Sequence, residues 1–512
     1  MKKRLFKCLC AFLSIPLLLT GCWQETPPDT EEMMLLQQED EPDMIEPKII
    51  LPEIFSLPYA PDQPLDPVSC PDGMQQVVSS LLYESLFRLN HELEPEPYLC
   101  INYFYDAENY LYTFYLRPGI TFSDNTPLTA TDVKTVLDRA RKSERYGARL
   151  SDISSISVSD DNTLQISLRS ANTALPALLD IPIVKAGTEQ ESAPIGTGPY
   201  LFSAGETGAC LVANQSWWQG SGHPTDRIAL VEAADQDTML YRFTSHDVQL
   251  VTADLTGTAP ISATGNVAFQ DAHTTILQYI GFNVTREPFN NATFRRILGQ
   301  GINRPYIISA FLSGHGTATQ FPISPVTSLY PANLETQFSL DTFSSALAAS
   351  GYTADEPLSL LVNQENAFKV SVANYLAETY TAAGMPITVH ALPWADYLAA
   401  LSVGEFDLYY GEVKLPADWD LSALLAAGGS LNYGGWADPQ TDRLISNLAS
   451  SDDRAGAAHA LCSYLRIQSP ILPLCFKSTS VLMQTNVLNG LSPTMAEPFY
   501  NLTDCTISLE KS

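Results

Sequence analysis

Residues Tyr112–Asp124 have the sequence YTFYLRPGITFSD, the most informative local pattern in this chain of 512 residues. Apolar and polar side chains alternate from Tyr110 to Leu116, which predicts a β-strand. The strand is expected to stop at Arg117-Pro118-Gly119, because proline and glycine favour a turn. Extended structure is expected to resume at Thr121-Phe122. The stretch therefore predicts a strand, a tight turn and a second extended segment.

Two helices are expected beside this unit. Apolar residues recur at helical spacing over Val77–Leu89, which predicts the first helix. The second is expected to begin near Val133, where Thr129 or Thr131 can act as the N-cap and Asp132 suits the first turn. Helices and strands therefore alternate along the chain, which is typical of an α/β protein.

Further strands are expected before and after these helices. Ile49–Leu51 is an apolar run that predicts a buried opening strand. Ile153–Ser159 and Asn162–Leu168 predict a β-hairpin that turns at Asp160-Asp161. The chain has no short-period repeat, which argues against a repeat architecture.

More sequence blocks follow in a fixed order. They are Tyr83–Leu86 (YESL), Leu128–Val133 (LTATDV), Pro194–Tyr200 (PIGTGPY), Tyr279–Asn283 (YIGFN), Pro288-Phe289, Phe294–Leu298 (FRRIL), Ile302–Arg304 (INR), Asn432, Trp436 and Asp442. Together with Tyr112–Asp124, they resemble the signature of the extracellular solute-binding proteins of oligopeptide and dipeptide ABC importers, bacterial solute-binding protein family 5. The resemblance covers roughly residues 49 to 505 in family order.

The resemblance implies a two-lobed α/β fold of the periplasmic-binding-protein type (type II, cluster C) with an extra inserted subdomain. Two crossing segments, near residues 275 and 478, would form the hinge, and the ligand would lie between the lobes. The implied parts are the first lobe at 48–75, 190–277 and 478–512, the inserted subdomain at 76–189, and the second lobe at 278–477.

The sequence departs from the family at several positions. Asn125 stands where relatives have glycine, and asparagine tolerates the left-handed backbone that glycine would supply. Peptide-binding relatives have an aspartate that pairs with the ligand's α-amine, and Leu415 occupies that position here. Glu412 stands in place of a tryptophan, and Asp418 matches a later, more structural aspartate. Glu412 or Asp418 could bind the amine, or the ligand is not a peptide.

Aromatic and acidic residues are concentrated in the segment where the family's cleft is expected. A cleft for a small polar solute needs flat apolar walls with a few placed polar groups, and Tyr and Trp offer both. The alternative for each aromatic side chain is a place in the core. The pair Trp217-Trp218 is not included, because it is expected to seal a lobe edge. The predicted ligand-binding residues are Trp394, Tyr397, Tyr409, Tyr410, Glu412, Asp418, Trp419, Asn432 and Tyr433.

The first residues have the pattern of a bacterial lipoprotein signal. Basic Lys2–Arg4 precedes an apolar run from Leu9 to Leu19, which is short of the roughly 20 residues that span a bilayer. The run ends in Leu19–Cys22 (LTGC), which resembles a lipobox. We expect a signal peptide at 1–21, a lipid on Cys22, an acidic flexible tether at 22–47, and attachment to the outer face of the cell membrane. Plain secretion or an uncleaved anchor helix is the alternative.

Composition narrows the function. The chain has 28 Lys and Arg against 57 Asp and Glu, a formal net charge of −29, so nucleic acid is not an expected partner. G-x-S-x-G, P-loop and GxGxxG motifs are absent, which removes the usual nucleophile and nucleotide sites. We therefore expect a monomeric binding protein without enzymatic activity, cofactor or metal.

Cysteines and histidines have no metal-binding spacing. The seven histidines are scattered, and only His315, between two glycines, is expected on an exposed loop. Disulfides and buried thiols remain equally open for the cysteines of the body. Those cysteines are Cys70, Cys100, Cys210, Cys462, Cys475 and Cys505.

The predicted function is that of a substrate-binding subunit of an ABC importer. It would capture a peptide or similar small polar solute between two lobes and deliver it to a permease. The alternative is a sensor or adhesion lipoprotein that uses the same fold without transport.

Overall fold

The computed structural model describes residues 51–71, 73–206, 208–258, 266–353 and 356–510. The predicted signal peptide, Cys22, the acidic tether and Ile49-Ile50 lie outside these residues. Leu51 precedes the first strand rather than belonging to it. In the described part of the chain, no helix is long and apolar enough to cross a membrane.

The first lobe is built on a mixed four-stranded sheet. Its strands, in spatial order, are β1 (Ser56–Tyr59), β12 (Arg227–Glu232), β11 (Gly208–Ala213) and β10 (Tyr200–Gly205). β1 runs parallel to β12, and the other pairs are antiparallel. Helix α2 (Met74–Leu82) packs on β1, and α4 (Gln236–Thr244) packs on β13 (Leu250–Ala253).

The inserted part carries a second, antiparallel sheet. Its strands, in spatial order, are β5 (Cys100–Asp106), β6 (Leu111–Leu116), β8 (Thr163–Leu168) and β7 (Ile153–Asp160). The predicted strand before Arg117 and the predicted hairpin are therefore confirmed. Asn125 has φ +66°, so the turn keeps its left-handed residue without glycine. Thr129 is the N-cap of α3 (Ala130–Ala140), and the Asp132 carboxylate accepts from its backbone N–H at 2.9 Å.

The predicted helix over Val77–Leu89 is wrong beyond Leu82. The carbonyl of Leu82 accepts from the N–H of Gly198 at 3.0 Å instead of continuing the helical ladder. A Cβ on Gly196 would lie 2.1 Å from that same carbonyl oxygen, so the glycines allow this close approach. The chain then forms short strands, which pair in antiparallel fashion. They are β2 (Glu84–Ser85) with β9 (Pro182–Ile183), and β3 (Phe87–Leu89) with β4 (Pro95–Pro97).

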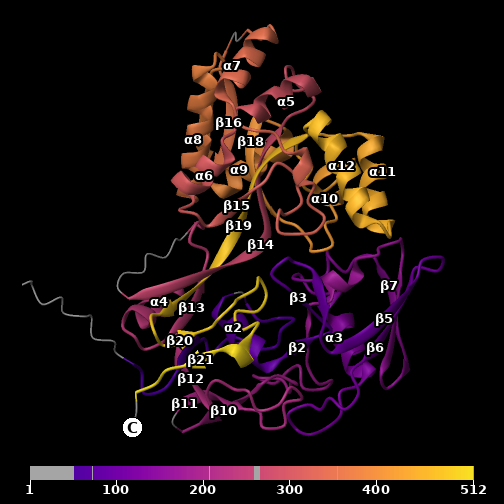
Figure 1. Ribbon diagram of the computed structural model, residues 1–512, viewed down its shortest axis with the longest axis vertical. Helices are drawn as coiled ribbons and strands as arrows, with labels where there is room; N and C mark the ends of the chain where they lie inside the picture. The colour runs from indigo at the N-terminus through magenta and orange to yellow at the C-terminus, as the bar shows by residue number, and fades with distance from the viewer. Residues whose placement is uncertain (1–50, 72, 207, 259–265, 354–355, 511–512) are drawn as a thin grey trace, which may run out of the picture. The chain divides into compact units, whose positions relative to one another are not determined.

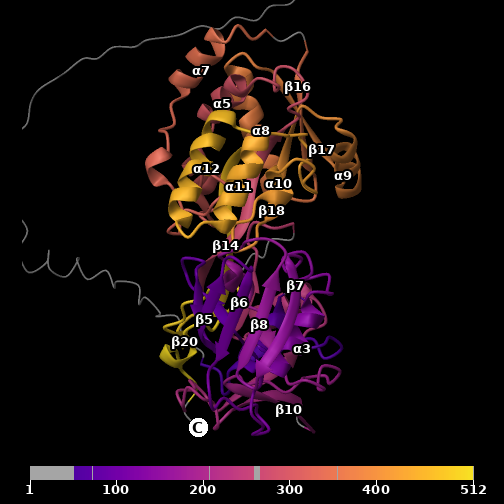
Figure 2. The ribbon, with the colours of Figure 1, turned by 90° about the vertical axis from the view of Figure 1, so that its right-hand side faces the viewer.

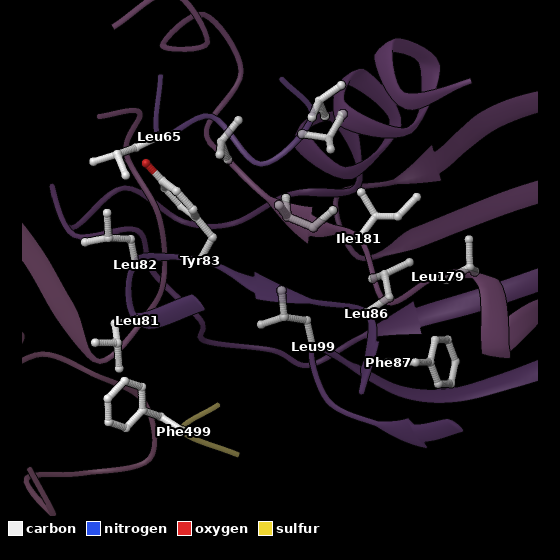
Figure 3. Packing of buried hydrophobic residues seen from close by; sticks show 14 of the residues in the cluster. Leu65, Leu81, Leu82, Tyr83, Leu86, Phe87, Leu99, Leu179, Ile181 and Phe499 are labelled. Atoms are coloured by element: carbon white, nitrogen blue, oxygen red, sulfur yellow. The ribbon is translucent and has the colours of Figure 1, made fainter. Parts of the chain in front are cut away.

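One apolar core runs through the first lobe and the inserted part. Figure 3 shows Leu81 and Phe499 on one side of this core and Phe87, Leu179 and Ile181 on the other. Leu86 and Leu99 lie between them and are fully buried. The inserted sheet is therefore packed onto the first lobe as one body.

The larger sheet of the molecule forms the second lobe and extends into the first lobe at β13. Its strands, in spatial order, are β13, β19 (Ile471–Gln484), β14 (Val267–Phe282), β18 (Leu408–Lys414), β16 (Leu358–Asn363) and β17 (Ile387–Leu392), with β15 (Gly316–Ala318) paired to β19. The helices around it, of which all but α6 are labelled in Figure 2, are α5 (Ala292–Gln300), α6 (Arg304–Phe311), α7 (Leu340–Ala349), α8 (Ala367–Ala382), α9 (Trp394–Val403), α10 (Ser422–Leu425), α11 (Pro439–Ser450) and α12 (Arg454–Gln468).

Two long antiparallel strands, β14 and β19, belong to both lobes (Figure 1). One end of β19 pairs with β13 of the first lobe, and one end of β14 pairs with β18 of the second. Between these ends the register shifts at His273–Leu277, where the Thr274 hydroxyl donates to the Lys477 carbonyl at 2.6 Å. The irregularity coincides with the hinge predicted near residues 275 and 478.

Candidate ligand-binding cleft

A cavity of about 1130 Å³ is lined by residues of both lobes. One wall includes Tyr83, Arg149 and Asn172 of the inserted part, which is packed onto the first lobe, and the second-lobe wall includes the segment from Lys414 to Asp420. Ligand pockets usually measure about 300–1,000 Å³. The cavity can therefore enclose a solute of several residues' size.

The segment 415–420, which follows β18, forms a tight turn at this cavity. The N–H of Leu415 donates to the Thr275 carbonyl at 3.0 Å, and the N–H of Trp419 donates to the Pro416 carbonyl at 3.0 Å. Trp419 has φ +63°, a conformation that is unfavourable for a bulky side chain. Strain of this kind persists only where the surroundings hold it, and it is concentrated at binding and catalytic sites.

The ring of Trp419 is part of the second-lobe core. Only 2% of the residue is exposed, and its ring meets that of Phe476 edge-on, with centroids 5.8 Å apart. Leu415 and Leu421 belong to the same apolar cluster. Trp419 thus lines the cavity and stabilises its wall at the same time.

Asp418 joins the two lobes. Its Oδ2 accepts from the side-chain amide of Asn172, in the inserted part, at 2.8 Å. Its Oδ1 accepts from the Asp420 N–H at 3.2 Å, and Arg454 donates to its carbonyl oxygen at 2.5 Å. Burial raises the pKa of Asp418, because a desolvated carboxylate is disfavoured. A cationic ligand group beside this carboxylate would favour its charged form.

A second contact between the lobes lies next to the first. Thr173 donates its backbone N–H to the Ala449 carbonyl at 2.8 Å and its hydroxyl to the Ser451 carbonyl at 3.1 Å. With Asn172, it forms a polar contact between the inserted part and the C-terminal end of α11. On this side the two parts meet through these hydrogen bonds and through an apolar contact of Leu89 and Ala177 with Ala417.

Some of the charged groups at the cavity wall are already in ion pairs. Arg149 binds Asp180 at 2.6 Å, and Glu497 binds Arg88 at 2.7 Å. Lys414 is exposed, and no acid among the described residues pairs with it. The wall therefore offers a free cation at Lys414, only a few residues along the chain from the carboxylate of Asp418. Such an arrangement suits a solute that carries both charges.

Of the nine predicted ligand-binding residues, all of which the structure describes, Asp418 and Trp419 line this cavity. Tyr397 and Tyr410 are buried in the second lobe, where the Tyr397 hydroxyl donates to the Tyr410 carbonyl at 2.8 Å and the Tyr410 hydroxyl donates to Gln278 at 2.7 Å. Tyr409 is buried against Tyr279, with ring centroids 5.8 Å apart. These three tyrosines are core residues.

The remaining aromatic and amide candidates, Trp394, Asn432 and Tyr433, contact neighbouring residues of the second lobe. Trp394 begins α9, is 53% exposed and stacks on Tyr397 with centroids 5.6 Å apart. Asn432 donates its side-chain amide to the Trp436 carbonyl at 2.6 Å and accepts from the Trp436 N–H at 3.0 Å. Tyr433 packs edge-on against Tyr409, with centroids 6.1 Å apart.

Glu412 belongs to a charged cluster on the crossing strands. Its carboxylate lies 3.1 Å from the Lys369 ammonium and 3.6 Å from that of Lys477, and it accepts from Gln278 at 2.8 Å. Lys477 also binds Asp254, in the first lobe, at 2.5 Å. Burial raises the pKa of Glu412, but the two lysines and the hydrogen bond from Gln278 together outweigh burial, so the net shift of this pKa is downward. The partners of Glu412 are therefore protein groups, and Lys477 links the cluster to Asp254 of the first lobe.

Two other expectations need correction. Trp217 is buried rather than at a surface edge, and the indole N–H groups of Trp217 and Trp218 both donate to the Glu84 carboxylate, at 2.9 and 2.8 Å. His315 is not exposed, because its ring is buried beside Asp271, with Nδ1 2.9 Å from the carboxylate. Local composition suggested a surface in both cases, but long-range polar partners bury these side chains.

The sequence left disulfides and buried thiols equally open for the cysteines of the body, and the structure shows thiols. All six cysteines of the described body are buried and form no disulfide with one another. They are Cys70, Cys100, Cys210, Cys462, Cys475 and Cys505.

The sequence analysis did not identify Asn172, the residue of the inserted part that approaches Asp418. Asn172 follows β8 in a short polar stretch with no motif of its own. Lys414 was also missed, although its position at the end of a strand, directly before Leu415, is a usable signal. Asn172 and Lys414 come from opposite walls of the cavity, so their possible role becomes visible only when both walls are known.

The comparisons with known proteins agree with this architecture. Residues 94–432 match the family described as bacterial extracellular solute-binding proteins, family 5 Middle. The glutathione-binding protein GsiB of Escherichia coli (strain K12) is 24% identical over 440 residues, covering 80% of this chain and 86% of GsiB.

Two solved structures share the fold. The ABC transporter substrate-binding protein CtaP of Listeria monocytogenes has a TM-score of 0.73 at 18% identity, covering 90% of this chain and 100% of CtaP. The oligopeptide-binding protein AppA of Bacillus subtilis, in complex with a nonapeptide, has a TM-score of 0.60 at 18% identity, covering 90% of this chain and 98% of AppA. The two-lobed α/β fold is thus confirmed, and the chain belongs to the family 5 bacterial extracellular solute-binding proteins.

Proposed function

We propose that this protein is the membrane-anchored, extracytoplasmic substrate-binding subunit of an ABC importer. It captures a peptide or similar small polar solute between its lobes and delivers it to permease subunits, acting as a monomer without catalysis. The supporting observation is the cavity of about 1130 Å³, whose walls come from two lobes joined by β14 and β19. The names of GsiB, CtaP and AppA point in the same direction.

The binding mechanism follows from the contacts between the lobes. A ligand shifts the population towards the closed form when it makes contacts there that the open form lacks. Asn172 and Asp418 approach each other at 2.8 Å, so a solute beside them would touch both lobes. The permease would then recognise the closed form. The proposal keeps the division of the chain into two lobes and an inserted subdomain, with boundaries after residues 75, 189, 277 and 477.

The ligand contacts that we propose are Asp418, Trp419 and Lys414. Asp418 offers a carboxylate for a cationic group, Lys414 offers an ammonium for an anionic one, and Trp419 offers an apolar edge. This assignment differs from that of peptide-binding relatives, because Leu415 occupies the usual amine-binding position. The buried tyrosines and Asn432 stabilise the second lobe, which carries this wall.

Replacing Asp418 with asparagine tests the charge while keeping the contact between the lobes, since asparagine still accepts from Asn172. Hydrogen bonds to charged groups contribute about 1.5–3 kcal/mol, so the affinity for peptides with a free amine is expected to fall about tenfold to a hundredfold. The measurement is calorimetric titration of the purified protein with glutathione and with peptides of increasing length.

The matched control is Asp452→Asn, because Asp452 is an exposed acid of the second lobe outside the cavity. It should bind like the wild type. If a peptide binds both variants and the wild type equally well, Asp418 does not recognise the ligand. If no peptide binds the wild type, the peptide class is excluded.

Membrane attachment is tested at Cys22. Cys22→Ala should abolish labelling with palmitate and release the protein from membranes, because the lipobox cysteine would carry the acyl chains. One chain alone anchors weakly, so stable attachment requires two or more. Palmitate labelling of the variant at the wild-type level would contradict lipidation at Cys22, and Cys8→Ala is the matched control within the signal peptide.

A further inference from the structure

A second cavity, of about 290 Å³, lies within the second lobe. It is bordered by the C-terminal ends of α5 and α12, the start of α6 and the first residues of β19. Its lining includes Arg296, Arg304 and Arg466, and no Asp or Glu is among the described residues that line it. In a chain of net charge −29, three arginines around one small cavity without an acid require a physical reason.

Arg304 provides the strongest argument. The residue is only 9% exposed, and its Nε donates to the Pro473 carbonyl at 2.7 Å. No described residue accepts from its two terminal nitrogens, and neither is among the fully buried side-chain nitrogens without a partner, so both can be reached from the cavity. Burial lowers the pKa of Arg304 to about 10, so the guanidinium stays charged at neutral pH. A largely buried charge without an acid in direct contact is costly, and an anion in the cavity would offset that cost.

The other two arginines come from different elements. Arg296 lies on α5 and is exposed, and Arg466 lies in the last turn of α12, where its Nη1 donates to the Leu334 carbonyl at 3.2 Å. Gln300 also lines the cavity, and its buried Oε1 has no donor partner among the described residues. Turning this amide over would present its N–H groups, since oxygen and nitrogen are assigned only from their partners.

The opposing charges are weaker. The carbonyl ends of α5 and α12 each correspond to roughly half a negative charge, and those of Gln468 and Ser469 are already occupied by Arg295. Glu335 is the acid that acts electrostatically on Arg304. It does not line the cavity, and it accepts from the Tyr330 hydroxyl at 2.5 Å. Three full positive charges therefore exceed the local negative charge.

We propose that this second cavity is a binding site for a small tetrahedral oxyanion of the phosphate class, separate from the cleft between the lobes. Guanidinium groups match such anions because their planar N–H groups can donate in pairs. The volume admits either a free phosphate ion or the phosphate group of a small monoester. The two sources share the same recognition chemistry.

The test is calorimetric titration of the purified full chain with inorganic phosphate at constant ionic strength, with glycerol phosphate in a parallel titration. The wild type should bind phosphate with one-to-one stoichiometry. The double variant Arg296→Gln/Arg466→Gln should weaken binding at least about tenfold, because each lost charged hydrogen bond contributes about 1.5–3 kcal/mol. Both positions are exposed, so the variant should keep the wild-type melting temperature without phosphate.

Two control variants distinguish this site from others. Arg443→Gln removes an exposed arginine of the second lobe outside the cavity, and Lys414→Gln removes the free cation of the cleft; both should bind phosphate like the wild type. Binding of glycerol phosphate as well as phosphate would identify the phosphate group as the ligand, and binding of phosphate alone would identify the free ion. Failure of both probes, loss of phosphate binding in Lys414→Gln, or equal weakening in Arg443→Gln would overturn the proposal.

Discussion

Replacing Trp419 with alanine is expected to lower the free energy of unfolding by about 3–5 kcal/mol, the usual cost of truncating a buried aromatic side chain. The ring is buried against Phe476, so alanine leaves a cavity beside Leu415 and Leu421. The positive φ at this position is about as unfavourable for alanine as for tryptophan, so the change isolates the ring. Chemical denaturation without ligand measures the loss.

The matched control for this variant is Trp394→Ala. Trp394 is a tryptophan of the same lobe that is 53% exposed, so its replacement should cost only about 0.5–1.5 kcal/mol for the lost stacking on Tyr397, well below the cost at Trp419. If the two variants unfold at the same denaturant concentration, the wall of the cleft does not depend on the buried ring. Trp419→Phe should fall between them, because it retains part of the apolar surface.

Replacing Glu84 with alanine should destabilise the first lobe by at least about 3 kcal/mol, since each buried donor left without an acceptor costs about 1–3 kcal/mol. Its carboxylate accepts from the Tyr98 hydroxyl at 2.9 Å, the Thr197 hydroxyl at 2.7 Å, and the indoles of Trp217 and Trp218. Thermal unfolding monitored by tryptophan fluorescence is suitable, because two of the donors are indoles.

Glu84→Gln distinguishes the hydrogen bonds from the charge. Glutamine keeps the oxygen that accepts from Tyr98 and Trp217, and the Thr197 hydroxyl can rotate to accept from the new amide, so a much smaller loss is expected. Burial raises the pKa of Glu84. Its contribution to stability is therefore present at low pH and lost as the pH rises through the folded-state pKa, and glutamine should remove this dependence. Glu108→Ala, at an exposed acid, should be neutral.

The sequence was informative where structure depends on neighbouring residues. The hairpin at Ile153–Leu168, the cap at Thr129 and the turn at Asn125 were predicted because their partners lie within a few positions. The helix end at Leu82 was missed because Gly198, far along the chain, takes the helix-terminating hydrogen bond. Polar and apolar spacing alone contains no information about such a partner.

The candidate site was predicted in part for the same reason. Asp418 and Trp419 follow a recognisable strand, and both line the cavity. Tyr409 and Tyr410 are aromatic residues of the same segment, but they are not at the cavity. They lie on β18, inside a sheet that is covered on both faces, so both neighbouring side chains are buried. Asn172 contributes from another part of the chain, and its role depends on how the lobes meet.

The strand β19 also determines when folding of the two lobes can be completed. Val481 and Met483 of this strand belong to the core of the first lobe, and Leu474 and Cys475 belong to that of the second. Synthesis runs from the N-terminus, and domains usually fold one after another as they emerge. Here neither lobe has its full core until residues 471–484 are available. Both lobes therefore mature late, and a chain that ends before Ile471 would leave both halves unfinished together, while the first lobe also needs later core residues such as Phe499.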